Sequence, residues 1–164
     1  MFGLTPLGIF HTLISLVAVV TGIVALTRDG KISWENAVGK TYVITTIITC
    51  LTGFGIFQHG GFGKPHALGV ITLVVFGFIY LAQQRSFFGR FSPYVVTVGF
   101  SMTFLFNMIP GIIETATRLP LDSPLASSPE DPNIQMAIAI CFVLFLIGAT
   151  IQVRKLSGYL KRGA

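Results

Sequence analysis

Five long stretches without a charged residue constrain this chain more than any other feature. No Asp, Glu, Lys or Arg occurs in residues 1–27, 41–63, 65–84, 91–113 or 132–153. Each stretch is long enough to cross a hydrocarbon core about 30 Å thick, which takes roughly 20 apolar residues. Only 10% of the 164 residues are charged, whereas a soluble domain carries about 25%. The pattern excludes a soluble globular domain and predicts an integral membrane protein.

The glycines, prolines and charges that flank these stretches set the expected helix boundaries. We predict an all-α integral membrane fold, a single domain built as a compact bundle of five transmembrane helices. The helices are expected at about 7–26, 40–57, 66–83, 93–113 and 134–153. The one long connection, residues 119–133, is acidic and contains four prolines, which prevent a regular helix. It is either an ordered cap or a mobile outer loop.

The distribution of lysine and arginine predicts the orientation, because short basic loops stay cytoplasmic. Lys64 and Arg118 fall on one side of the predicted helices. Nine basic residues fall on the other side: Arg28, Lys31, Lys40, Arg85, Arg90, Arg154, Lys155, Lys161 and Arg162. We therefore expect an outer N-terminus, a cytoplasmic C-terminus and a multi-pass protein of the plasma (inner) membrane. Tyr42, Tyr80 and Tyr94 lie near the expected inner helix ends, as an interfacial aromatic belt would require.

The remaining composition excludes several kinds of protein. The net charge of +5 comes from basic residues that flank apolar spans, so the expected partner is the lipid bilayer and not a nucleic acid. Cys50 and Cys141 both lie inside apolar stretches, where a thiol usually serves packing. No HExxH, CxxC or phosphate-binding glycine loop is present. The sequence therefore identifies no catalytic residue and no enzyme.

Polar residues inside two of the predicted helices indicate where helices pack. Thr41, Thr45, Thr49 and Thr52 recur at a spacing that places their hydroxyls on one helical face. Threonine allows close helix approach, so we predict a packing face, with a polar lining for a ligand or proton path as the alternative. Asn107, deep in the 93–113 helix, is expected to make an interhelical hydrogen bond.

All three histidines are expected at the outer side of the membrane. His11, His59, His66 and Glu114 share one depth there, and ionisable groups near hydrocarbon favour a common polar pocket. His11 and His66 could be the axial ligands of a b-type haem. The four residues could instead form a zinc or copper shell. The alternative is that each histidine is a hydrogen-bonded anchor and that Glu114 pairs with Arg118 at a helix end.

Three stretches in order carry a family resemblance: LGIFHTLISLVAVVTGIVAL, GKTYVITTIITCLTGFGIF and GGFGKPHALGVITLV. Residues 6–80 thereby resemble a bacterial predicted membrane protein family of unknown function (domain of unknown function 2306). The residues that match its pattern are His11, Gly39 with Tyr42, and Gly61, Phe62, Gly63 and His66. Glu35 and Asn36 stand where the family pattern has His-Arg. The resemblance implies a membrane fold and no particular activity.

Three functions remain open from the sequence. The first is a small membrane protein that binds haem b or a divalent metal at its outer histidines and acts in electron transfer or metal handling. The second is a non-catalytic accessory or assembly subunit of a larger membrane complex. The third is an oligomeric transporter or channel component, formed by self-association or with other membrane subunits.

Overall fold

The computed structural model describes residues 5–57, 61–84 and 87–162, and these residues form an all-α bundle. Five α-helices, with one 3-10 turn before the fourth, confirm the predicted all-α class. They are α1 (Pro6–Asp29), α2 (Ala37–Gly53), α3 (Lys64–Gln83), η1 (Gly89–Phe91), α4 (Ser92–Arg118) and α5 (Pro132–Arg162). Four of them, α1, α3, α4 and α5, are long and apolar enough to cross a membrane, whereas α2 has 17 residues.

Several helix ends differ from the predicted boundaries. α2 begins at Ala37 and not at 40, because the Asn36 side chain caps it, and it ends at Gly53 and not at 57. α4 continues to Arg118 and α5 to Arg162, beyond the predicted ends at 113 and 153. The predicted ends were placed where the apolar residues stop. Both helices continue beyond that point into charged segments.

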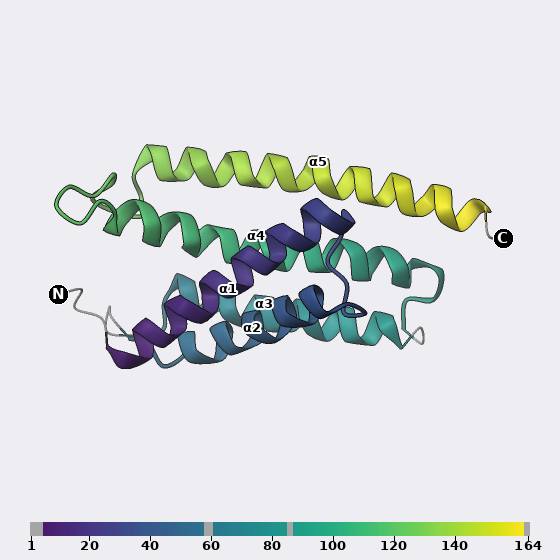
Figure 1. The fold of residues 1–164 in the computed structure, drawn as a ribbon, viewed down its shortest axis with the longest axis horizontal. Helices are drawn as coiled ribbons and strands as arrows, with labels where there is room; N and C mark the ends of the chain where they lie inside the picture. Colours follow the sequence, from purple (N-terminus) through teal and green to yellow (C-terminus); the bar gives the residue numbers. More distant parts are fainter. Residues whose placement is uncertain (1–4, 58–60, 85–86, 163–164) are drawn as a thin grey trace.

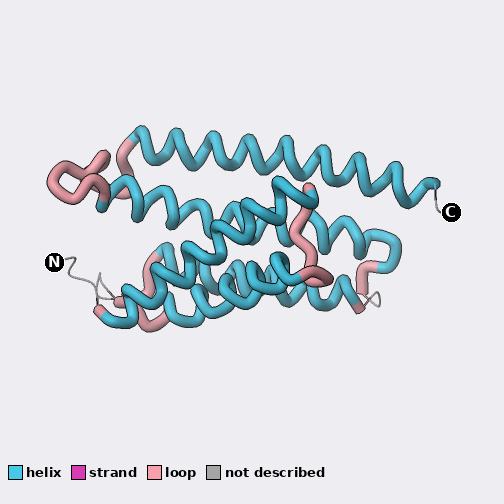
Figure 2. The backbone as a smooth tube through the Cα atoms, in the orientation of Figure 1, coloured by secondary structure: helices cyan, strands magenta, loops and turns pink. Residues whose placement is uncertain are grey.

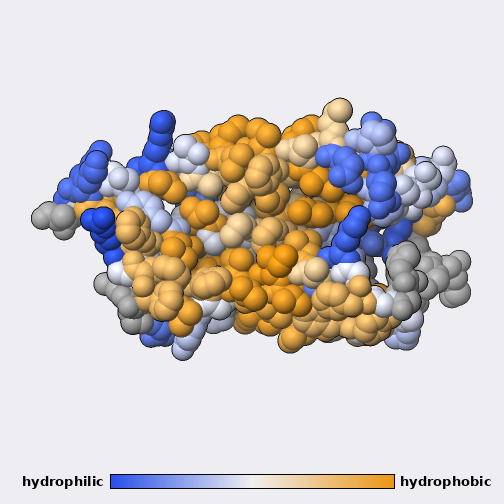
Figure 3. Space-filling model, turned by 180° about the vertical axis from the view of Figure 1, so that it is seen from behind, coloured by the Kyte–Doolittle hydropathy of each residue, from blue (hydrophilic) through white to orange (hydrophobic). Residues whose placement is uncertain are grey.

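The helices run alternately up and down the bundle (Figures 1 and 2). α1, α3 and α5 run in one direction and α2 and α4 in the other (Figure 1). We term the end where α1 begins the N-end and the end where α5 finishes the C-end. The space-filling view shows an apolar middle with hydrophilic residues gathered at both ends (Figure 3), as a bilayer requires.

Helix packing is uneven across the bundle. α4 packs extensively against both α3 and α5 and also touches α1, while α1 packs mainly on α2. A single residue of α5, Ile134, is buried among those described. α5 is therefore the peripheral helix, covered on one side by α4.

Small residues let α1 approach its neighbours closely. Ala18 and Ala25 are fully buried, and Gly22 lies between them on the same face of α1. A Cβ on Gly22 would lie 2.5 Å from the Phe104 ring and 3.2 Å from the Tyr42 ring. This small-residue spacing is typical of tight helix pairs in membranes, and here it also admits a side chain from α4.

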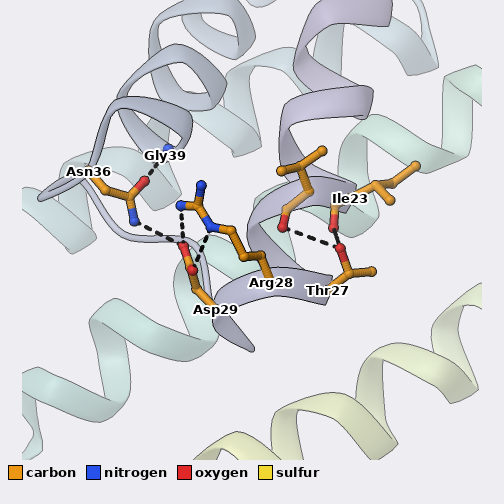
Figure 4. Close-up of polar contacts among 7 residues, drawn as sticks. Ile23, Thr27, Arg28, Asp29, Asn36 and Gly39 are labelled. Atoms are coloured by element: carbon orange, nitrogen blue, oxygen red, sulfur yellow. Dashed lines mark hydrogen bonds and ion pairs between the residues drawn. The ribbon is translucent and has the colours of Figure 1, made fainter.

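The connection from α1 to α2 is held by side-chain hydrogen bonds (Figure 4). Asn36 accepts a 2.8 Å bond from the Gly39 backbone N–H and donates a 3.1 Å bond to Asp29. Asp29 also pairs with Arg28, its neighbour in the chain, at 2.8 Å. The capping residue of α2 is thus tied to the last turn of α1.

The chain also passes very close to Gly39 at this connection. A Cβ on Gly39 would lie 1.8 Å from the Ser33 carbonyl oxygen. Because that contact is with backbone, only glycine fits without a shift of the loop. This gives the glycine of the family-like motif a packing role.

The proline-rich connection between α4 and α5 folds back on the bundle. Ala126 is 5% exposed, and its backbone N–H donates a 3.0 Å bond to the Ala116 carbonyl in α4. Glu130 pairs with Lys64 at the start of α3, at 3.7 Å. The connection is therefore hydrogen-bonded to α4 and paired with the start of α3.

Candidate functional site

A buried polar network joins α2 to α4 inside the bundle. The Tyr42 hydroxyl and the Thr103 hydroxyl are hydrogen-bonded at 2.9 Å, and both residues are fully buried. Asn107 donates through Nδ2 to the Tyr42 hydroxyl at 3.2 Å and to the Thr46 hydroxyl at 3.0 Å. Buried polar groups need such partners, since an unpaired one costs about 1–3 kcal/mol. Asn107 therefore makes two interhelical bonds across one interface.

Tyr42 does not belong to an interfacial aromatic belt. Its ring is buried between helices, whereas Tyr80 is 63% exposed. Tyrosine suits either place because its ring is apolar and its hydroxyl polar. Tyr42 is buried because its ring fits beside Gly22 and its hydroxyl bonds to the Thr103 hydroxyl.

The predicted threonine face of α2 differs along its length. Thr45 is buried and Thr41 is exposed. The hydroxyls of Thr41, Thr45 and Thr52 each donate to a carbonyl four residues earlier in α2. Thr49 has a buried hydroxyl without a hydrogen-bond partner among the described residues. Thr46, one position off the predicted face, is the α2 threonine that bonds to α4.

His11 is attached to α2 at the N-end. Its Nδ1 lies 3.0 Å from the Thr52 hydroxyl oxygen, and its ring packs over Gly53, where a Cβ would lie 3.3 Å away. Because the Thr52 hydroxyl donates to the Ile48 carbonyl, both bonds form together when Nδ1 carries the ring proton. In that neutral form Nε2 holds the lone pair. Glu114 acts electrostatically on this ring.

His66 supports the start of α3. Its Nδ1 accepts a 3.2 Å bond from the Gly63 N–H, and its ring lies 5.2 Å from the Phe57 ring and 5.3 Å from the Phe62 ring. A ring that accepts at Nδ1 carries its proton at Nε2 when neutral. That Nε2 is buried and has no partner within the described ranges. Haem or metal ligation through Nε2 would require moving the proton and losing the bond to Gly63.

The predicted outer site is therefore divided between different contacts. His11 bonds to α2, His66 bonds to its own helix start, and Glu114 forms an ion pair with Arg118. No three His, Cys, Asp or Glu side chains in the described ranges gather closely enough to hold a metal ion. His59 lies outside the described residues. The joint haem or metal site thus stays a prediction.

A groove opens between α1, α4 and α5 on the opposite side of α4 from α3. Its volume is about 290 Å³, near the lower end of the range for small-molecule sites. The lining residues are Ile23, Leu26, Ser101, Phe104, Leu105, Met108, Cys141, Leu144, Phe145, Gly148, Ala149 and Gln152. Nothing lies within 4 Å of a Cβ placed on Gly148. An apolar chain or ring can enter here from the lipid.

Gln152 provides the polar end of this groove. Its Oε1 accepts a 2.8 Å bond from the Ser101 hydroxyl in α4, and its Nε2 donates a 2.8 Å bond to the Gly30 carbonyl after α1. One amide therefore joins three parts of the chain. The sequence does not distinguish Gln152, because a glutamine just before a basic tail resembles an ordinary helix end. A polar amide three residues before Lys155, on an otherwise apolar helix, is the sequence feature that could have indicated a polar contact.

Comparisons with family models, with curated proteins and with solved structures found no match to this chain. Its own residues identify the chain as a small multi-span helical membrane protein.

Proposed function

We propose that this protein crosses the plasma membrane five times and binds one amphiphile of the bilayer in the groove between α1, α4 and α5. The N-terminus lies outside and the C-terminus in the cytoplasm, as the excess of basic residues at the C-end favours. α1 and α3 run in the same direction (Figure 1), which supports a return of the chain through α2 as the fifth pass. Its 17 residues extend about 25 Å.

The groove is the observation that supports amphiphile binding. Its wall is apolar over most of its length and ends at the hydrogen-bonded pair Ser101 and Gln152. A ligand with an apolar body and a polar head matches that order of surfaces. Gly148 and Ala149 leave room on the α5 side, and α4 is the helix on which α5 packs extensively among the described residues.

Two glycine substitutions in α5 test this proposal. Gly148→Leu fills the groove, whereas Gly158→Leu adds the same side chain to the same helix, at a glycine that also faces open space but does not line the groove. The probe is a mixture of dioleoylphosphatidylglycerol and dioleoylphosphatidylcholine, and native mass spectrometry counts the lipids retained in mild detergent. We expect wild type and Gly158→Leu to retain one lipid and Gly148→Leu to retain none. Equal retention by all three proteins, or none by wild type, would refute amphiphile binding.

Cofactor binding at the outer end is the second candidate. The neutral form of His11 leaves Nε2 as a ligand atom, and Glu114 acts electrostatically on the same ring. Haem b would give the purified protein a Soret band that disappears in His11→Ala, and a divalent metal would appear in metal analysis. A colourless, metal-free protein from haem-replete and metal-replete cells would remove this candidate and leave accessory-subunit or transporter roles beside amphiphile binding.

A further inference from the structure

The C-end of the groove lies beside two lysines. The 2.8 Å bond from Gln152 to the Gly30 carbonyl brings α5 against the segment that follows α1. Lys31 is the next residue after Gly30, and Lys155 lies three positions after Gln152, on the same face of α5. Both lysines are exposed, and neither forms an ion pair within the described ranges, although Lys31 also acts electrostatically on Asp29. Two lysines thus lie within three positions of the two residues that are hydrogen-bonded at the polar end of the groove.

The charge around these lysines is strongly positive. Asp29 and Glu35 are the acidic residues of this end, and Asp29 is paired with Arg28. The described basic residues of the same end are Arg28, Lys31, Lys40, Arg90, Arg154, Lys155, Lys161 and Arg162. A zwitterionic or neutral ligand would gain little from this surplus, whereas an anionic head would gain at each nearby lysine.

We propose that the amphiphile is an anionic phospholipid of the cytoplasmic leaflet. One acyl chain lies in the groove, and the headgroup phosphate lies between Lys31 and Lys155. This inference rests on the proposed function, because the chain must first be held in the groove. Basic pockets between transmembrane helices on the cytoplasmic side suit such headgroups, and each lysine near the membrane surface adds to the attraction.

The test compares two lipids that differ only in their headgroup. Purified protein in mild detergent is incubated with equal amounts of dioleoylphosphatidylglycerol and dioleoylphosphatidylcholine, and native mass spectrometry measures the ratio of the two bound lipids. Because the acyl chains are identical, the groove itself cannot separate them. We expect wild type to prefer the anionic lipid on the order of tenfold.

Two double variants test which lysines cause the preference for the anionic lipid. Lys31→Gln/Lys155→Gln should bring the ratio close to one while the total bound lipid falls only moderately. Lys40→Gln/Lys161→Gln removes the same charge from the same end, at positions at least nine residues from Gly30 and Gln152, and should keep most of the preference. All four side chains are exposed, so the variants are expected to fold.

The outcomes separate this inference from the proposed function. If wild type binds both lipids equally and Gly148→Leu still abolishes binding, the groove binds an amphiphile but the anionic headgroup is wrong. An equal loss of preference in both double variants would also overturn it, since the effect would then come from general charge. If Gly148→Leu retains as much lipid as wild type, the groove proposal itself fails.

Discussion

Gln152 in α5 donates a hydrogen bond to the backbone carbonyl of Gly30, 122 positions earlier in the chain. The same amide accepts from Ser101, so the peripheral helix is joined to α4 and to the end of α1 at one point. Gly30 has a positive φ of 68° and caps the end of α1, and its carbonyl accepts this bond. These two bonds add to the packing of α5 on α4 and also join α5 to the segment after α1.

Gln152→Leu should destabilise the bundle, because it removes both bonds and leaves the Gly30 carbonyl and the Ser101 hydroxyl without this partner. Interhelical hydrogen bonds in membranes are worth about 0.6 kcal/mol on average, and two together predict a loss of about 1 kcal/mol. Thermal unfolding in detergent measures it. Thr150→Val is the matched control, since that hydroxyl bonds only within α5. Equal melting temperatures for the two variants would contradict the role of Gln152.

The number and class of the helices could be predicted because a bilayer imposes one strong rule on sequence. A charge between residues 65 and 84 would have been costly, and none occurs. The helix ends were harder to predict, because α5 continues as a helix through the charged residues Arg154 and Lys155, where no apolar pattern indicates it. The groove could not be predicted, because its lining comes from three helices, α1, α4 and α5, and the sequence does not specify how they are arranged.

Asn107→Leu should cost about 1–2 kcal/mol, because it leaves the Thr46 hydroxyl without its donor and removes a partner of Tyr42. Thr97→Val in the same helix removes a hydroxyl that bonds only to its own helix and should have a much smaller effect. Unfolding in a detergent titration measures both. A cost for Asn107→Leu no larger than the control would mean that the network contributes little to stability.

The threonines show why residue type alone does not identify a contact. Their spacing predicts which side chains share a face of α2, but it does not say which neighbour that face meets. Thr46 lies outside the predicted set and makes the contact with α4, because Asn107 stands opposite it. Likewise the glycine and histidine motif before α3 suggests ligands, whereas Gly63 and His66 bond to each other there.

Thr45→Leu should destabilise the bundle by about 1–3 kcal/mol, because the residue is 8% exposed and a larger side chain overpacks the interface. Thr49→Leu should also destabilise it, although the loss of an unpartnered hydroxyl offsets part of the cost. Thr41→Leu is the control on the same face, since Thr41 is exposed. Thermal stability in detergent ranks the three. A ranking with Thr41→Leu lowest in stability would reject this packing face.

Gly39→Ala should destabilise the α1–α2 connection by about 1–3 kcal/mol, because the new methyl group would overlap the Ser33 carbonyl. Gly77→Ala in α3 makes the same chemical change where nothing lies within 4 Å, and it should be neutral or slightly stabilising. Melting curves of the two variants, recorded in one detergent, give the comparison. A neutral Gly39→Ala would show that the loop moves away at no cost.

The orientation can be tested by labelling single cysteines in a background where Cys50 and Cys141 are replaced by alanine. Gly61→Cys lies at the N-end, in the connection after α2, and Tyr159→Cys lies at the C-end on a side chain that is 77% exposed. An impermeant maleimide added to intact cells should label Gly61→Cys and leave Tyr159→Cys unlabelled until the membrane is opened. If α2 did not cross, the connection after it would remain on the side of the α1–α2 loop and Gly61→Cys would be protected. Labelling of Tyr159→Cys from outside would instead reverse the orientation, and with it the assignment of the basic C-end to the cytoplasmic leaflet.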